Sequence, residues 1–167
     1  TKLDITIKFL MFTAYRLGYS SKARWSDGRL MFLEARTDDD GNVGQVNAQR
    51  SNGVIKITGP DGSKAVTSDI FLTNHWNVAV TQSAEVLNTI TGKVNKVSMR
   101  NLGLETITAE KIEIKARRWA YTGDLQNEVW YDDEGRWVKM RFAGKDGSSI
   151  EYVCTKCLGG GKAAAHH

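Results

Sequence analysis

The chain contains little proline, cysteine or histidine, and it has no long apolar run. One proline and sixteen glycines among 167 residues indicate tight turns instead of rigid linkers. No apolar stretch approaches the roughly 18 residues of a membrane-spanning helix, so we expect no such segment. Hydrophobic residues make up 41% of the chain and charged residues 25%, which excludes a disordered or fibrous protein.

The sequence also lacks a dominant charge of one sign. Its net charge is +4, the densest basic stretch covers residues 111–118, and acidic residues gather at 38–40 and 132–134. A nucleic-acid-binding protein usually concentrates its positive charge on one face. The mixture along this chain predicts an ordinary solvated surface, and we expect no nucleic-acid partner.

The two ends of the sequence look processed. The chain begins at Thr1 without an initiator Met or a secretory leader, so we expect that an upstream segment has been removed. Residues 159–167 resemble a linker and the start of a purification tag. We therefore expect a single β domain over residues 1–158, followed by a linker and tag remnant at 159–167. His75 is then the only histidine of the domain.

Turn signals recur at hairpin spacing in the first half of the chain. They are Asp27-Gly28, Asp40-Gly41, Asn52-Gly53 and Asp61-Gly62. Asn or Asp before Gly favours the tight turns that match the twist of paired strands. Apolar and polar residues alternate between such turns, as in residues 3–9, 112–116 and 137–142. This period of two predicts strands with one buried face and one wet face.

The predicted fold is therefore all-β. We expect a single antiparallel, strongly curved sheet or an open barrel, with at most one short helix. The only place for that helix is residues 76–87, where the apolar spacing fits a helix poorly. A short helix and an irregular crossover both remain open for this segment.

Cys154 and Cys157 form the most distinctive short motif. A gap of two residues lets both sulfurs close a small disulfide ring or reach one metal ion. Zinc normally takes four ligands, and the chain has no second cysteine pair. A structural thiol pair and a disulfide are the favoured interpretations, with metal or redox chemistry as the alternative. We expect no metal site and no cofactor.

A polar and aromatic cluster interrupts the strand pattern at residues 74–77. It consists of Asn74, His75, Trp76 and Asn77. Loop residues of this kind are better functional candidates than core residues. A lone histidine is also often a hydrogen-bonded structural group, so both roles stay open for His75.

Tryptophan is abundant for a chain of this length. The five residues are Trp25, Trp76, Trp119, Trp130 and Trp137. Tryptophan buries a large apolar area, so these side chains are suited to filling the core. They are equally suited to lining a β-cavity that holds a small ligand.

Several short motifs resemble one uncharacterised family of exported proteobacterial proteins, described only as a domain of unknown function. The motifs occur in one order: RWSDGRL at 24–30, TDDDG at 37–41, NHWN at 74–77, LNTITGK at 87–93, GDL at 123–125, WYD at 130–132, GRW at 135–137 and DGS at 146–148. The resemblance implies a signal peptide and a periplasmic or secreted setting, in which the cysteines could be oxidised. It also implies a distant likeness to half-barrels that carry lipoproteins. It supplies no catalytic residues.

The favoured function is binding of an apolar small molecule or a lipid-like ligand in a β-cavity. The tryptophans would supply contact area, while Asn74, His75 and Asn77 would orient a polar end of the ligand. An enzyme is the second hypothesis, with His75 as general acid or base near Asp132 or Glu128. A structural role, in which a strand edge or the aromatic loops dock a partner, is the third.

Overall fold

The computed structural model describes residues 2–9, 12–73, 75–144, 147–155 and 157, with side chains from residue 18 onward. The chain divides into two compact units. Unit 1 comprises Thr1–Ile70 and Leu87–Val94, and unit 2 comprises Phe71–Val86 and Asn95–His167. The expected linker and tag remnant at 159–167 lies outside the described residues.

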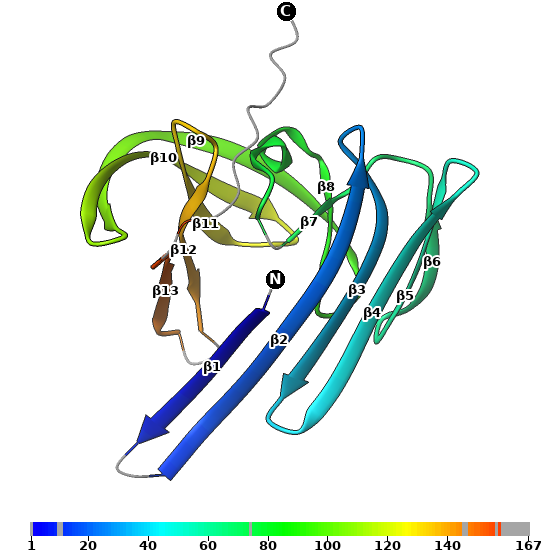
Figure 1. Ribbon diagram of the computed structural model, residues 1–167, viewed down its shortest axis with the longest axis horizontal. Helices are drawn as coiled ribbons and strands as arrows, with labels where there is room; N and C mark the ends of the chain where they lie inside the picture. The colour runs from blue at the N-terminus through cyan, green and yellow to red at the C-terminus, as the bar shows by residue number, and fades with distance from the viewer. Residues whose placement is uncertain (1, 10–11, 74, 145–146, 156, 158–167) are drawn as a thin grey trace, which may run out of the picture. The chain divides into compact units, whose positions relative to one another are not determined.

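Unit 1 contains a six-stranded sheet whose strands lie in chain order (Figure 1). The strands are β1 (Lys2–Phe9), β2 (Phe12–Ser26), β3 (Arg29–Asp39), β4 (Asn42–Ser51), β5 (Val54–Gly59) and β6 (Gly62–Val66). Each strand pairs antiparallel with the next. The pairs Asp27-Gly28, Asp40-Gly41 and Asn52-Gly53 have positive φ, as two-residue hairpin turns require. These three predicted turns are confirmed.

One face of this sheet forms the core of unit 1. Leu33, Ala35, Val46, Ala48, Ile55 and Ile57 are at most 1% exposed, and the residues between them are more exposed. The second segment of the unit packs with this core: Leu87 is fully buried, and the Tyr19 hydroxyl donates to Thr89 Oγ1 at 2.8 Å. Unit 1 therefore needs residues from both of its segments.

A seven-stranded sheet in the order β13-β12-β11-β10-β9-β8-β7 forms most of unit 2, although Leu87, the last residue of β8, and Val94, the first residue of β9, belong to unit 1. The strands are β7 (Phe71–Leu72), β8 (Glu85–Leu87), β9 (Val94–Ala109), β10 (Ile112–Gly123), β11 (Asn127–Asp132), β12 (Trp137–Ala143) and β13 (Ser149–Val153). The segment expected to hold a short helix or a crossover contains one 3-10 turn, η1 (Val78–Gln82). No described helix is long and apolar enough to cross a membrane.

The sheet of unit 2 buries side chains on both faces. Val129 and Tyr131 belong to one apolar cluster with Val80 of η1. Trp130, between them on β11, belongs to a second cluster with Ala116 and Val138. Because successive side chains of a strand point to opposite faces, the two clusters lie on opposite faces of β11.

The all-β prediction is confirmed, but the prediction of a single sheet is wrong. Among the described strands there are two sheets, and neither closes into a barrel. The irregular segment after β6, residues 67–70, forms no strand ladder. Turn signals and alternation specify which neighbouring strands form hairpins. They do not specify whether two hairpin series join at their edges, so the number of sheets was not predictable from them.

Candidate functional site

His75 lies inside unit 2, where it is only 3% exposed. Its Nδ1 atom lies 3.2 Å from the Tyr121 hydroxyl, and its carbonyl accepts a hydrogen bond from the Tyr131 hydroxyl at 2.9 Å. Burial lowers the pKa of His75 to about 4, because the charged imidazolium loses its hydration. The ring is therefore neutral at neutral pH.

The backbone of His75 is in the left-handed region, with φ of 59°. Few residues other than glycine adopt this region, and histidine is among the more tolerant. A hydrogen bond between the His75 ring and the Tyr121 hydroxyl, and one donated by the Tyr131 hydroxyl to the His75 carbonyl, hold this conformation. The arrangement gives His75 a positioning role in the segment that leads into η1.

The neighbours of His75 have separate local roles. Asn77 caps η1, because its Oδ1 accepts from the Ala79 N–H at 3.0 Å. The rings of Trp76 and Trp137 lie 6.3 Å apart, centroid to centroid. Asn74 lies outside the described residues.

The tryptophans do not form one site. Trp119 and Trp137 are half-buried and pack against the cluster that contains Tyr121 and Tyr131. Trp130 is 1% exposed and belongs to the cluster on the opposite face. Trp25 belongs to unit 1 and is 36% exposed. The structure therefore brings Trp76, Trp119 and Trp137 to the cluster near His75, and it places Trp130 in the cluster on the opposite face of the sheet.

The two carboxylates named as acid–base partners of His75 are bound to arginines. Asp132 accepts from Arg136 Nε at 2.7 Å, and its Oδ1 also accepts from the backbone N–H of Arg136. Glu128 accepts from both Arg118 and Arg141. His75 is thus hydrogen-bonded to tyrosines, whereas Asp132 and Glu128 are paired with arginines.

A row of charged side chains surrounds Trp130. Arg118, Lys139 and Arg141 each lie within 6 Å of its ring centroid, and its indole N–H donates to Glu105 Oε2 at 2.9 Å. This hydrogen bond and a second from Arg118 lower the pKa of Glu105. Burial alone would raise the pKa of Glu128, but hydrogen bonds from Arg118 and Arg141 outweigh it and lower that pKa. Both acids are ionised at neutral pH.

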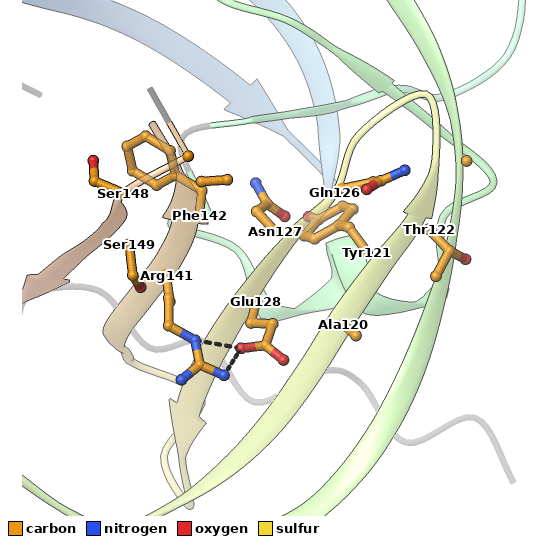
Figure 2. A pocket seen from close by; sticks show the side chains of 13 residues that line it. Ala120, Tyr121, Thr122, Gln126, Asn127, Glu128, Arg141, Phe142, Ser148 and Ser149 are labelled. Atoms are coloured by element: carbon orange, nitrogen blue, oxygen red, sulfur yellow. Dashed lines mark hydrogen bonds and ion pairs between the residues drawn. The ribbon is translucent and has the colours of Figure 1, made fainter. Parts of the chain in front are cut away.

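A groove of about 400 Å³ opens in unit 2 at the end of the sheet where the β10–β11 and β12–β13 hairpins turn. It is lined by residues 120–123, 126–128, 141–143 and 147–149. Figure 2 shows the Arg141–Glu128 ion pair on one wall, with Asn127 and Phe142 farther along the groove. None of the five tryptophans is among the described residues that line it.

Cross-strand register builds the charged wall of this groove. Ala120, Glu128, Arg141 and Glu151 lie opposite one another on four successive strands. Arg141 Nε donates to Glu128 Oε2 at 2.7 Å, which holds the guanidinium at the wall. Its side chain keeps 37% exposure, so part of the guanidinium still faces solvent.

Asn127 supplies the other distinctive polar group of the groove. Its Oδ1 atom is buried and has no hydrogen-bond partner among the described residues. An unpaired buried amide oxygen costs about 1–3 kcal/mol. A ligand that donates an N–H or O–H at this point would recover that cost.

Sequence reasoning missed Arg141, Asn127 and Phe142 as groove residues. Residues 137–142 were predicted as a strand, and the alternation marks Arg141 as a solvent-side residue. No signal along the chain places Arg141 beside Glu128, because the two are thirteen residues apart and meet only through the register of β11 and β12.

Cys154 and Cys157 are bonded to each other, with Cα atoms 5.3 Å apart. Cys157 is 6% exposed within the cluster that contains Trp130, and its N–H donates to Glu110 Oε1 at 2.7 Å. The disulfide thus packs the end of the described chain onto the seven-stranded sheet. No three His, Cys, Asp or Glu side chains in the described part are grouped as metal ligands.

Fold and groove define an all-β protein with two open sheets and a small-molecule-sized groove on one of them. A family described as "Domain of unknown function (DUF6134)" matches residues 1–155, and the chain belongs to this family. No curated protein matches the chain, and no solved structure matches it. The expected membership of an uncharacterised family is confirmed, while the proteobacterial origin, the export and the likeness to lipoprotein carriers stay predictions.

Proposed function

We propose that the protein is a binding module for a small molecule with an apolar body and a polar end, held in the groove of unit 2. The observation that carries this proposal is the groove itself. Its volume of about 400 Å³ falls within the range of small-molecule sites, roughly 300–1,000 Å³. Its wall combines Phe142 and two alanine methyl groups with a few polar groups.

The polar groups support an orienting role for one end of the ligand. Arg141 is held by Glu128 and still offers N–H donors, and Asn127 Oδ1 offers a buried acceptor. Asn127 and Arg141 face opposite sides of the strands (Figure 2), so they bind separate groups of the ligand. An N–H or O–H of the ligand can donate to Asn127, and an acceptor oxygen can bind Arg141. The apolar body then lies against Phe142, Ala120 and Ala143.

Binding is favoured over catalysis by the surroundings of His75. A general acid or base must come within hydrogen-bond reach of its substrate, and its pKa should lie near the working pH. His75 is buried, bonded to Tyr121 and shifted to a pKa of about 4. We also propose that the protein is exported, because disulfides such as Cys154–Cys157 persist in oxidising compartments.

The test is a substitution that introduces a tryptophan side chain into the groove. Ala143 is exposed and lines the groove, so Ala143→Trp should fill part of it without disturbing the core. Ala65→Trp is the control, because Ala65 is an exposed strand residue of unit 1. The probe is a dansyl-labelled undecanoic acid, titrated by fluorescence into each variant.

We expect Ala143→Trp to weaken binding of the labelled fatty acid at least about tenfold, with Ala65→Trp within about twofold of the parent. Native mass spectrometry of freshly purified protein should also show extra mass that is lost on denaturation. Equal binding by both variants would show that the groove is not the site. Absence of any binding by the parent protein would reject an apolar ligand of this class.

A further inference from the structure

The outer face of the six-stranded sheet gathers positive charge. Lys22, Arg24, Arg36 and Lys56 are exposed at strand positions that alternate with the buried core residues. Two carboxylates of β3 share this face by strand register: Glu34, opposite Lys22, and Asp38, two residues after Arg36. No ion pair joins any of the four cations to another described side chain. The face therefore has cationic groups that are available to an anionic partner.

Three amide side chains run through the middle of this face. Gln45, Asn47 and Gln49 occupy alternate positions of β4 and are all exposed. Alternate residues of a strand lie about 7 Å apart on one face. Gln45 Nε2 lies 3.4 Å from Asn47 Oδ1, which agrees with a shared face.

The register places the cations directly beside this amide column. Arg36 of β3 lies opposite Gln45, and Lys56 of β5 lies opposite Gln49. The amide column thus has Arg36 on one side and Lys56 on the other, while Glu34 of β3 lies opposite the central Asn47. Amides bind hydroxyl groups well because each offers both a donor and an acceptor, whereas Arg and Lys bind carboxylates.

We propose that this face binds an acidic polysaccharide, that is, a chain of hydroxyl-rich sugars that carry carboxylates. The amide column would bind sugar hydroxyls, and Arg36 and Lys56 would bind carboxylates on either side. The face belongs to unit 1, whereas the groove belongs to unit 2, so this proposal does not rest on the groove ligand.

Two other anionic partners fit this face less well. Proteins that bind single-stranded nucleic acid stack bases on free aromatic rings. The aromatic ring here, Phe32, is half-buried, and the Arg24 guanidinium lies over it at 5.0 Å. A membrane surface requires apolar side chains gathered on the binding face. The exposed Trp25 and Val43 instead adjoin turns at opposite ends of β3.

The experiment measures binding of fluorescently labelled polygalacturonate, alginate and hyaluronate fragments to the full chain at constant ionic strength. One variant, Arg36→Gln with Lys56→Gln, removes two charges from the face. A second variant, Asn47→Ala with Gln49→Ala, removes two amides and no charge. The control, Lys115→Gln with Arg117→Gln, removes two exposed charges from β10 of unit 2. Thermal melting checks that each variant is folded.

We expect at least one of the three polymers to bind, and each face variant to weaken that binding at least about tenfold. The unit 2 control should stay within about twofold of the parent. If the unit 2 control binds as weakly as the face variants, the binding is unspecific charge attraction and the proposal is overturned. If the amide variant binds as tightly as the parent, the amide column takes no part, and the proposal is overturned as well.

Two further arms distinguish the partner. Labelled oligo-dT and vesicles of anionic phospholipid are titrated under the same conditions. Tighter binding of either one than of all three polysaccharides, with the same dependence on the face variants, would overturn the polysaccharide proposal in favour of that partner. Failure of all three polysaccharides to bind would overturn it as well.

Discussion

The buried imidazole of His75 makes folding stability sensitive to pH. Its pKa is about 4 in the folded protein, below the ordinary value of 6.5. The unfolded chain therefore takes up a proton between these values while the folded chain does not. The contribution of His75 to the free energy of unfolding is fully present above pH 6.5. It falls by about 3 kcal/mol as the pH is lowered toward 4.

The measurement that checks this is urea unfolding at a series of pH values, for the parent and for His75→Asn. Asparagine tolerates the left-handed backbone of this position but does not titrate. His166 and His167 are present in both proteins, so their titration cancels. We expect the parent to lose more stability than the variant between pH 6.5 and 4. Parallel curves would show that His75 is not a buried neutral group.

At the scale of strands, the ion pairs of the protein differ in strength according to burial. Arg118 binds both Glu105 and Glu128, and its side chain is 24% exposed. Arg29 lies 3.3 Å from Asp69, and these side chains are 64% and 50% exposed. Exposed pairs contribute little because water screens them, whereas charge-assisted hydrogen bonds that are partly buried contribute more.

Replacing each arginine by methionine makes a matched comparison with the same change of charge. We expect Arg118→Met to lower the free energy of unfolding by about 2 kcal/mol, because Glu105 and Glu128 each lose one of their charge-assisted hydrogen bonds. Arg29→Met should change it by less than about 0.5 kcal/mol. Chemical denaturation followed by tryptophan fluorescence measures both. Equal effects of the two substitutions would contradict the importance of the network around Trp130.

At the scale of the whole molecule, the two units are interleaved in the sequence. Unit 1 includes Leu87–Val94, although residues 71–86 of the other unit come between its two segments. That second segment supplies buried Leu87, the Thr89 partner of Tyr19, and the Thr91 carbonyl that accepts from the Asp61 N–H at 2.9 Å. Burial of a leucine contributes about 2 kcal/mol, a large part of the stability of a small domain.

Two fragments test this requirement. A fragment of residues 1–70 ends before the second segment, and a fragment of residues 1–94 includes it. We expect the longer fragment to show dispersed amide resonances by NMR and the shorter one to show the narrow dispersion of an unfolded chain. A folded 1–70 fragment would show that unit 1 does not need its second segment.

Local patterns predicted the strands and turns because their causes are local. Asp27-Gly28, Asp40-Gly41 and Asn52-Gly53 form the expected turns, since Gly accepts positive φ and the preceding Asp or Asn tolerates it. The alternating segments at residues 3–9, 112–116 and 137–142 fall within β1, β10 and β12, because a strand has a period of two.

The candidate site was less predictable, because its parts meet only across strands. Tryptophans were expected to act together, yet Trp130 lies on the opposite face of β11 from Tyr131, and Trp25 belongs to the other unit. His75 was named from its loop, but its burial against Tyr121 depends on a contact across 46 residues. Burial decided its pKa, and no local pattern encodes burial of a loop residue.

The sequence by itself determined that this protein is all-β and where most of its hairpins turn, since these properties follow from residue preferences and short-range periodicity. The tertiary structure alone decided that the strands form two sheets, that Arg141 and Glu128 share the wall of a groove, and that the cations of three strands share one face with the amides of β4. Those outcomes depend on which strand edges pair and in which register, and that choice is made by the free energy of contacts between residues far apart in the chain.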